Sequence, residues 1–273
     1  SRDGRRITYV RWTDAGLGQI MTANANGSGA RAVTSMRGHY ANPRFSPNGN
    51  TIVFEKRSGG YLTSPEFSEN EGVYRVSASG GTPELIARDT SNPQFGADSD
   101  RLFMLGRKDG KLQLLSADLD GEARQVHAEG ELATEYHVSP RGDFVAFREN
   151  YEVFATLLMP GGQAVTVGEK ASSLPVVRAS KGGADYIGWT QGGDMLTWSM
   201  GPVLYRASIA AMFANAPKDK DAPEFVPPTS GTSLERMVAA DKPRGTVAIT
   251  GAKILTMAGD GAGAIANGTI VIT

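Results

Sequence analysis

The stretch NPRFSPNGNTIVF, from Asn42 to Phe54, places a polar four-residue turn between two short runs of bulky residues. Proline at the second turn position fixes its own backbone angle, and glycine at the fourth position accepts a positive φ. In the run after the turn, Ile52 and Phe54 alternate with other residues, which is typical of a strand covered on one face. The stretch therefore predicts a β-hairpin.

The same order of turn and strand returns along the chain. Similar stretches are NPQFGADSDRLFM, EYHVSPRGDFVAF and DYIGWTQGGDMLTW, and the chain opens with SRDGRRITYV, which matches the second half of the pattern. The residues aligned at the fourth turn position are Gly4, Gly49, Ser99, Gly142 and Gly193, which are 43 to 51 residues apart. A period of about 40–50 residues is that of β-propeller blades and related arrays.

Each repeat also carries signals for two further strands. A third strand follows a variable loop, and a glycine turn then leads to a short fourth strand, predicted in ARAVTS, PELIAR, ARQVHA and, at residues 163–168, QAVTVG. A β-sandwich also has short strands and glycine turns, but it does not need one order repeated at one period. The sequence predicts an all-β fold, a β-propeller of four-stranded antiparallel blades that is incomplete, with about five blades visible. The first blade lacks its innermost strand.

The innermost strand of each repeat separates packing positions from candidate binding positions. Bulky residues stand directly before the turn, and we expect them to pack between blades: Phe45, Phe95, Val138 and Trp189. The residues before three of them, Arg44, Gln94 and His137, would then face a central channel and are the candidate binding positions. Solvated channel lining without a specific role is the alternative for these polar residues.

The repeats end before the chain does. We expect the partial propeller over residues 1–212, and over 213–244 a linker in which SLERMVAADKPRG supplies a possible last propeller strand. Residues 245–273 contain strand-like runs between glycine turns and predict the first strands of a small β-sandwich domain. A charged insertion at 61–72 is interpreted either as a contact loop or as a mobile excursion.

Composition excludes several classes of function. The chain has 273 residues, 40% of them hydrophobic, a net charge of −1 and no cysteine. This balance gives no electrostatic case for binding nucleic acid, and no apolar run reaches the ~20 residues that span a bilayer. Without cysteine there are no disulfides and no thiolate metal sites. The chain contains no signal peptide, so any export signal would lie outside it.

A search for catalytic motifs finds none. There is no G-x-S-x-G serine elbow, DLDG at Asp118 lacks the other ligands of a calcium loop, and no helix pattern follows the glycine-rich GDGAGAIANG. The three histidines, His39, His127 and His137, form no H-x-H pair. The sequence therefore predicts no catalytic, cofactor-binding or metal-binding residues in this chain.

Two resemblances extend this interpretation. The units built on SPNG and SPRGDFVAF resemble the TolB-type propeller repeat, over about residues 1–210. That repeat also occurs in periplasmic peptidases of the prolyl oligopeptidase class. The segment PRGTVAITGAKILTM with IANGTIVIT looks like the start of an amidohydrolase, over residues 245–273, although the insertion AGDGAGA leaves the alignment of its second strand uncertain.

These resemblances imply that the chain is the non-catalytic propeller part of a larger exported amidohydrolase, periplasmic or secreted, which hydrolyses a C–N or related bond. The propeller would bind ligands or gate access. A divalent metal of the zinc type would activate water in a catalytic domain outside this chain. Upstream blades and that catalytic domain are the expected partners, and a protein partner or an oligomer is also open. The alternatives are a TolB-like periplasmic interaction module and the propeller of a prolyl-oligopeptidase-like serine peptidase.

Overall fold

The structure is a computed structural model that describes residues 1–58, 70–159, 161–190, 192–214, 223–242, 244–258 and 263–273. It divides into two units, Ser1–Leu234 and Glu235–Thr273. Most of the insertion predicted at 61–72 lies outside the described residues.

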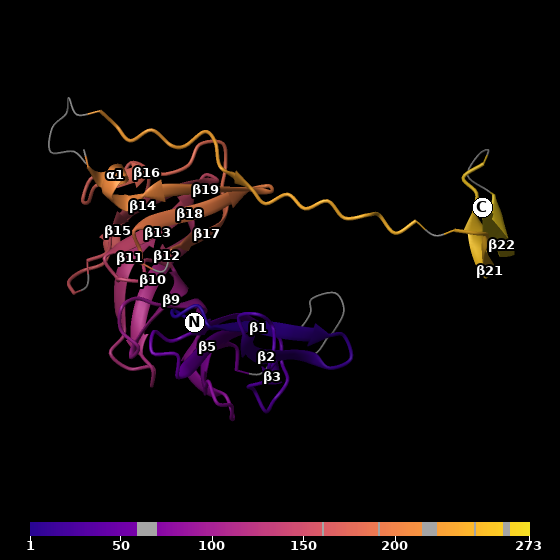
Figure 1. The fold of residues 1–273 in the computed structure, drawn as a ribbon, viewed down its shortest axis with the longest axis horizontal. Helices are drawn as coiled ribbons and strands as arrows, with labels where there is room; N and C mark the ends of the chain where they lie inside the picture. Colours follow the sequence, from indigo (N-terminus) through magenta and orange to yellow (C-terminus); the bar gives the residue numbers. More distant parts are fainter. Residues whose placement is uncertain (59–69, 160, 191, 215–222, 243, 259–262) are drawn as a thin grey trace. The chain divides into compact units, whose positions relative to one another are not determined.

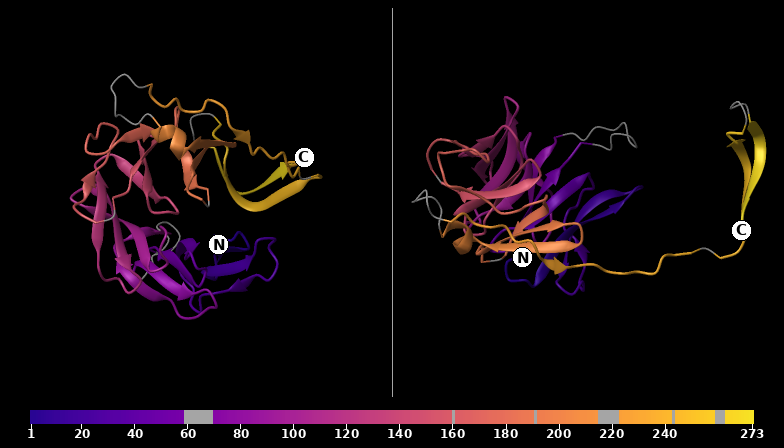
Figure 2. Two further views of the ribbon diagram at one scale, coloured as in Figure 1. Left: turned by 60° about the vertical axis from the view of Figure 1, so that its left-hand side comes forward. Right: turned by 90° about the horizontal axis from the view of Figure 1, so that it is seen from above.

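The first unit consists of five β-sheets that follow one another along the chain (Figures 1 and 2). Strands β1 (Arg6–Thr13), β2 (Leu17–Asn24) and β3 (Arg31–Ala32) form sheet 1. Sheet 2 contains β4 (Tyr40–Phe45), β5 (Thr51–Lys56), β6 (Gly72–Ser77) and β7 (Glu84–Arg88). Sheet 3 contains β8 (Ser91–Phe95), β9 (Arg101–Lys108), β10 (Lys111–Asp118) and β11 (Gln125–Gly130), joined by β15 (Val165–Thr166). Sheet 4 contains β12 (Ala133–Val138), β13 (Phe144–Glu149), β14 (Glu152–Leu157) and β16 (Val176–Arg178), and sheet 5 contains β17 (Asp185–Trp189), β18 (Met195–Met200), β19 (Val203–Ser208) and β20 (Thr232–Ser233).

This arrangement confirms the predicted propeller class, with antiparallel hairpins in every sheet. Sheet 1 has three strands, and β1 pairs only with β2 among the described residues. It therefore lacks the innermost strand that β4, β8, β12 and β17 provide in the other sheets, as the repeat alignment predicts.

The polar turns that begin with serine or threonine share one hydrogen-bonding pattern. In the turn between β4 and β5, Ser46 Oγ accepts from the Thr51 amide at 3.0 Å, and the Gly49 amide donates to the Ser46 carbonyl at 2.8 Å. At the start of the chain, Ser1 Oγ accepts from the Arg6 amide at 2.9 Å in the same way. A buried serine thus satisfies the first amide of the second strand, which fixes where that strand begins.

In the three sheets that have a neighbour on each side, the second strand is covered on both faces rather than on one, which corrects the sequence interpretation there. In β18 of sheet 5 the predicted alternation is present, with Leu196 and Trp198 buried. Ile52, Val53 and Phe54 are consecutive in β5 and all have 0% exposure. Phe54 packs toward sheet 1, whereas Val53 packs toward sheet 3. Because successive residues of a strand point to opposite faces, a sheet between two neighbours needs an almost continuous apolar run.

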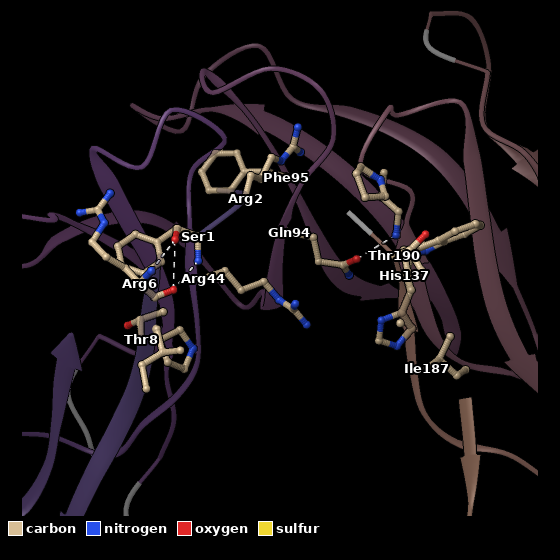
Figure 3. Close-up of a pocket in the computed structure, with 17 residues that line it drawn as sticks. Ser1, Arg2, Arg6, Thr8, Arg44, Gln94, Phe95, His137, Ile187 and Thr190 are labelled. Carbon is tan, nitrogen blue, oxygen red and sulfur yellow. Dashed lines mark hydrogen bonds between the residues drawn. The ribbon is translucent and has the colours of Figure 1, made fainter. Parts of the chain in front are cut away.

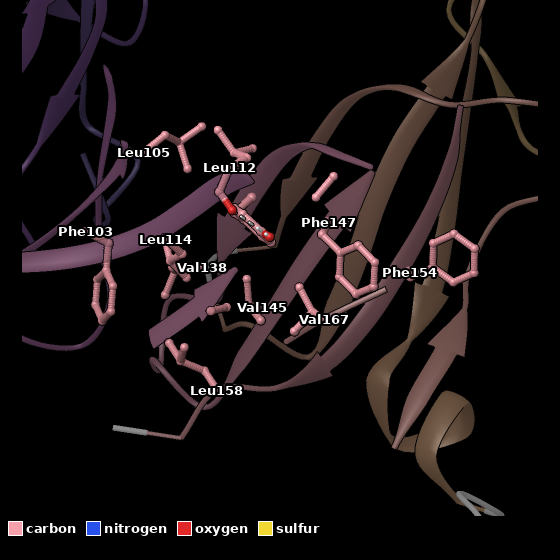
Figure 4. Close-up of a cluster of buried hydrophobic side chains, with 13 residues drawn as sticks. Phe103, Leu105, Leu112, Leu114, Val138, Val145, Phe147, Phe154, Leu158 and Val167 are labelled. Atoms are coloured by element: carbon pink, nitrogen blue, oxygen red, sulfur yellow. Dashed lines mark hydrogen bonds between the residues drawn. The ribbon is translucent and has the colours of Figure 1, made fainter. Parts of the chain in front are cut away.

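Four hydrophobic clusters lie between the five sheets, one at each junction. Figure 4 shows the cluster between sheets 3 and 4, in which Leu114 and Phe147 are fully buried. The bulky residues predicted to pack between blades each belong to one of the clusters or pack against it: Phe45, Phe95, Val138 and Trp189. Their predicted packing role is confirmed.

The fourth strand of sheet 4 is not the predicted segment QAVTVG. Within that segment, β15 pairs in parallel with β11 of sheet 3, and β16 forms the outer strand of sheet 4. Val167 adds a hydrogen bond from its amide to the Glu129 carbonyl at 2.8 Å. β15 thereby covers the outer edge of sheet 3 and pairs backbone groups that would otherwise be left open at that edge.

The outer strand of sheet 5 also differs from the prediction. It is β20, which pairs with β19 at Val203 and Leu204, so it takes only Ser233 from the predicted segment SLERMVAADKPRG. The described residues after Ser233, up to the second unit's hairpin, form no strand. Gly231 lies against the Leu204 carbonyl, 2.5 Å from where a Cβ would stand, so only glycine fits the approach to β19.

Helix α1 (Ile209–Phe213) follows β19 directly. Ser208 caps it by accepting from the Ala211 amide at 3.4 Å, and Ile209 and Met212 bury their side chains in the cluster between sheets 4 and 5. Among the described residues, no helix has the length and apolarity needed to cross a membrane.

The second unit contains one antiparallel hairpin of β21 (Val247–Leu255) and β22 (Ala264–Ile272). Cross-strand pairing places Val247, Ile249, Ile270 and Ile272 on one face, and all of them are exposed. A two-stranded hairpin is at best marginally stable alone, so this apolar face calls for a covering layer.

We predict that Ser139→Ala lowers the free energy of unfolding by about 1–2 kcal/mol. Ser139 is fully buried and its hydroxyl accepts from the Phe144 amide at 3.1 Å, so the substitution leaves that amide without a partner. Ser172→Ala, an exposed serine outside the strands, is the control and should change little. Urea unfolding measures both variants, and equal effects would contradict the proposed role of the turn serine.

Candidate functional site

Three of the innermost strands, β4, β8 and β17, contain a bulge residue three positions before the packing residue. Asn42 and Asn92 have φ values of 51° and 46°, and Tyr186 has 51°, and the strand register shifts beside each of them. Asparagine tolerates this left-handed conformation better than most residues do. The bulges bend the inner strands at the rim of the fold and free polar groups there for contacts between sheets.

Glu55 ties two of these bulges together. Its carboxylate accepts from the Asn42 side chain at 3.0 Å in its own sheet and from the Asn92 amide at 3.2 Å in the next sheet. Arg57 donates to the other carboxylate oxygen at 2.8 Å. Glu55 is buried, and this full set of donors compensates for removing its charge from water.

Arg148 occupies the equivalent position in sheet 4 with the opposite charge. It forms ion pairs of 2.8 Å with Glu135 in its own sheet and with Asp185 in sheet 5. Glu135 also contacts His137 Nε2 at 2.7 Å. Burial opposes the charged form of Glu135, but the hydrogen bond from His137 and the charges of His137 and Arg148 outweigh it and lower the pKa of that carboxyl below its ordinary 4.5.

A cavity of about 440 Å³ lies where the inner ends of all five sheets meet, and we call it the central cavity (Figure 3). The three predicted binding positions, Arg44, Gln94 and His137, all line it. The structure thus brings together residues from β4, β8 and β12 that are far apart in sequence. Whether they bind a ligand stays a prediction.

Gln94 already has structural partners. Its amide nitrogen donates to the Tyr136 carbonyl at 2.7 Å, and its oxygen accepts from the Val138 amide at 2.9 Å. The buried side-chain amide therefore hydrogen-bonds the backbone of β12 as a neighbouring strand would, and it joins β8 to β12. Trp189 holds β12 from the other side by donating from its indole nitrogen to the His137 carbonyl at 3.1 Å.

Arg44 differs from Gln94 in that its side chain forms no hydrogen bond or ion pair with any residue that the structure describes. It extends from β4 into the central cavity toward the side formed by Gln94 and His137 (Figure 3). The residue is exposed to solvent, while desolvation by nearby protein lowers the pKa of its guanidinium from the ordinary value. The side chain stays cationic at physiological pH.

The described lining of the central cavity is cationic in a chain of net charge −1. It contains Arg2, Arg6 and Arg44, and neither aspartate nor glutamate. The sequence analysis missed Arg2 and Arg6, because they lie in the opening turn and in β1 instead of in an innermost strand. Their alignment with the turn of the second repeat is the signal that could have found them.

A second cavity of about 680 Å³ shares Arg44, His137 and Ile187 with the central cavity, and we call it the ion-pair cavity. Its lining contains Glu55, Glu135 and Asp185, together with the arginines that pair with them. The two cavities therefore separate a cationic region from a region of balanced charge.

Ser116 and His127 form a close pair that resembles the start of a catalytic dyad. Ser116 Oγ lies 2.6 Å from His127 Nε2, but Ser116 has 0% exposure and also accepts from Arg101 Nε at 2.9 Å. A nucleophile must reach its substrate, so this geometry supports a structural role within sheet 3. Among the described residues, no group of three histidine, aspartate or glutamate side chains is placed to hold a metal ion.

We predict that Gln94→Leu lowers the free energy of unfolding by about 2–4 kcal/mol, because it leaves the Tyr136 carbonyl and the Val138 amide buried without partners. Gln19→Leu is the control, since Gln19 is only partly buried and accepts a hydrogen bond from the exposed Arg11. Chemical unfolding should show a small change for the control. If Gln94→Leu lowers the free energy of unfolding no more than the control does, Gln94 does not join β8 to β12 as described.

We predict that His127 makes the fold sensitive to acid. Burial lowers the pKa of His127 below 6.5 in the folded chain. Below that pH the unfolded chain takes up a proton that the folded chain resists, so the free energy of unfolding falls as the pH decreases from about 6.5. Across this range the free energy of unfolding should depend less on pH for His127→Gln than for the wild-type chain. Parallel pH profiles for the two proteins would show that His127 does not contribute to the acid sensitivity.

Comparisons with known proteins agree with the propeller geometry. No family model matches the sequence, and no curated protein matches it. Among solved structures, TolB from Acinetobacter baumannii superposes with a TM-score of 0.56 at 17% identity, covering 76% of this chain and 50% of TolB. The chain thus spans about half the length of that protein.

Two further solved structures share the arrangement. Hydrazine synthase from Kuenenia stuttgartiensis has a TM-score of 0.52 at 12% identity over 75% of this chain and 35% of its own. An oligogalacturonate lyase in complex with manganese has a TM-score of 0.51 at 10% identity over 74% of this chain and 61% of its own. At these identities the likeness concerns the fold, and it shows that the first unit has a TolB-like β-propeller fold.

Proposed function

We propose that the first unit is a non-catalytic binding or gating module of a larger exported amidohydrolase. The observation that carries the binding role is the central cavity, which residues from all five sheets line. Arg44 lies in this cavity without a hydrogen-bond or ion-pair partner among the described residues. Ligand sites are commonly concave, with apolar walls and a few convergent polar groups. Phe45, Phe95 and Trp189 supply such walls beside Arg44.

The hairpin of the second unit supports the amidohydrolase part of the proposal. Its sequence resembles the opening strands of that family, and its face of exposed valine and isoleucine side chains suits a strand pair within a small β-sandwich. In this proposal the remaining strands of the sandwich cover that face, and the catalytic domain follows. Periplasmic or secreted localisation rests on the same resemblance.

The zinc-type metal of the proposed enzyme has no ligand set in the described part of this chain. His39, His127 and His137 lie before β4, in β11 and in β12, and the structure gives them no shared site. A metal that activates water would therefore be held by the catalytic domain, and the propeller would control which molecules reach it.

The second candidate function is a TolB-like module that binds a protein partner in the cell envelope. Among the described residues β1 pairs only with β2, and a strand edge of this kind can accept an extended segment of a protein partner. The two candidates differ in whether a hydrolase domain accompanies the propeller.

The test compares this chain with the complete product of its gene. We expect residues 1–273 to hydrolyse no amide or lactam substrate with added Zn²⁺. We expect the complete product to contain an H-x-H motif after the hairpin and to show amide or lactam hydrolysis that a chelator removes and Zn²⁺ restores. A complete product without such hydrolysis would refute the amidohydrolase assignment and favour the interaction module.

A further inference from the structure

Arg44 stands apart from the other arginines of the two cavities. Arg57 pairs with Glu55, and Arg148 pairs with Glu135 and Asp185. The remaining two have backbone partners: Arg2 donates to the Gly96 carbonyl, and Arg6 donates to the Gly49 carbonyl and lies over the Phe45 ring. Among the described residues, Arg44 alone in this group has no hydrogen bond or ion pair.

Arg44 is exposed to solvent, and its charged guanidinium has no partner among the described residues, so it is available to an anion that enters the cavity. Arg44 also lines the ion-pair cavity, but the carboxylates of that cavity already have cationic partners: Glu55, Glu135 and Asp185. The planar fork of arginine matches the two oxygens of a carboxylate, which makes such a pair stronger and better oriented than one with lysine.

The surroundings of Arg44 define the rest of the ligand. The central cavity has apolar walls from Phe45, Phe95, Ile187 and Trp189, and its described lining contains no carboxylate that would repel an anion. A small inorganic anion would leave these walls without contacts. A carboxylate attached to an apolar or aromatic body would satisfy the guanidinium and the walls together.

We propose that the central cavity binds a carboxylate carried by an apolar or aromatic body, with Arg44 as the residue that recognises the anion. This ligand class rests on the proposed binding role and makes it specific. The carboxylate could belong to a small molecule or to the C-terminus of a peptide, and both present the same group to Arg44.

The experiment measures dissociation constants by NMR titration for phenylacetate and for the neutral, nearly isosteric phenylacetamide. We expect phenylacetate to bind the wild-type chain at least about tenfold more tightly, as a charged hydrogen-bonded pair requires. Arg44→Gln should abolish that difference, and Arg44→Lys should retain only part of it. Arg107→Gln is the matched control, because Arg107 is exposed and lies outside the central cavity.

Thermal unfolding confirms that each variant is folded before binding is compared. Equal affinity for the acid and the amide, or a tenfold difference that survives Arg44→Gln, would overturn the proposal. Sulfate binding as tightly as phenylacetate would also overturn it, because the apolar walls would then contribute nothing.

A second pair of probes separates the two sources of the carboxylate. N-acetyl-Ala-Ala-Phe with a free C-terminus is compared with its C-terminal amide, and a peptide acid that binds more tightly than phenylacetate assigns the site to chain termini. The result is independent of the parent enzyme. If the complete protein shows no zinc-dependent hydrolysis, the difference in affinity between acid and amide is unaffected. If that difference in affinity is absent, only the proposed carboxylate site is refuted.

Discussion

The structure depends on apolar contact between the faces of neighbouring sheets. Each junction between sheets holds one cluster, and the middle strands supply residues to two clusters at once, as Val53 and Phe54 do in β5 and Leu102 and Phe103 do in β9. Burial of such side chains contributes about 1.5–3 kcal/mol each. No single sheet could bury an apolar face alone, so each one depends on contact with a neighbouring sheet.

Contacts at the inner rim then set the distance and angle between sheets more finely than apolar packing can. Glu55 and Arg148 occupy equivalent strand positions with opposite charges, and each joins the inner strand of its own sheet to that of the next. Gln94 and Trp189 hold β12 from both sides by hydrogen bonds to its backbone. Because hydrogen bonds are directional and apolar contacts are not, these hydrogen bonds and ion pairs define the shape of the central cavity.

The position of Arg44 follows from this construction. Side chains alternate along an inner strand, so the residue before a packing position points toward the axis. At that position Gln94 and His137 have partners in the rim, and Arg44 has none among the described residues. The polar groups of the rim thus hold neighbouring sheets together, and Arg44 is the inner residue on which the proposed ligand site is based.

The sequence by itself determined the repeat, the turn positions, the inter-sheet packing residues and the set of inner positions from which the candidate site is drawn. These features are local, because a turn serine, a glycine and a bulky residue act within a few positions of one another. The sequence interpretation failed where distant segments compete for one edge, as when β15 joins β11 and β16 takes the outer place in sheet 4. Only the tertiary structure decided that pairing, the burial of both strand faces, and which polar inner residue lacks a partner, because each depends on side chains that lie far apart along the chain.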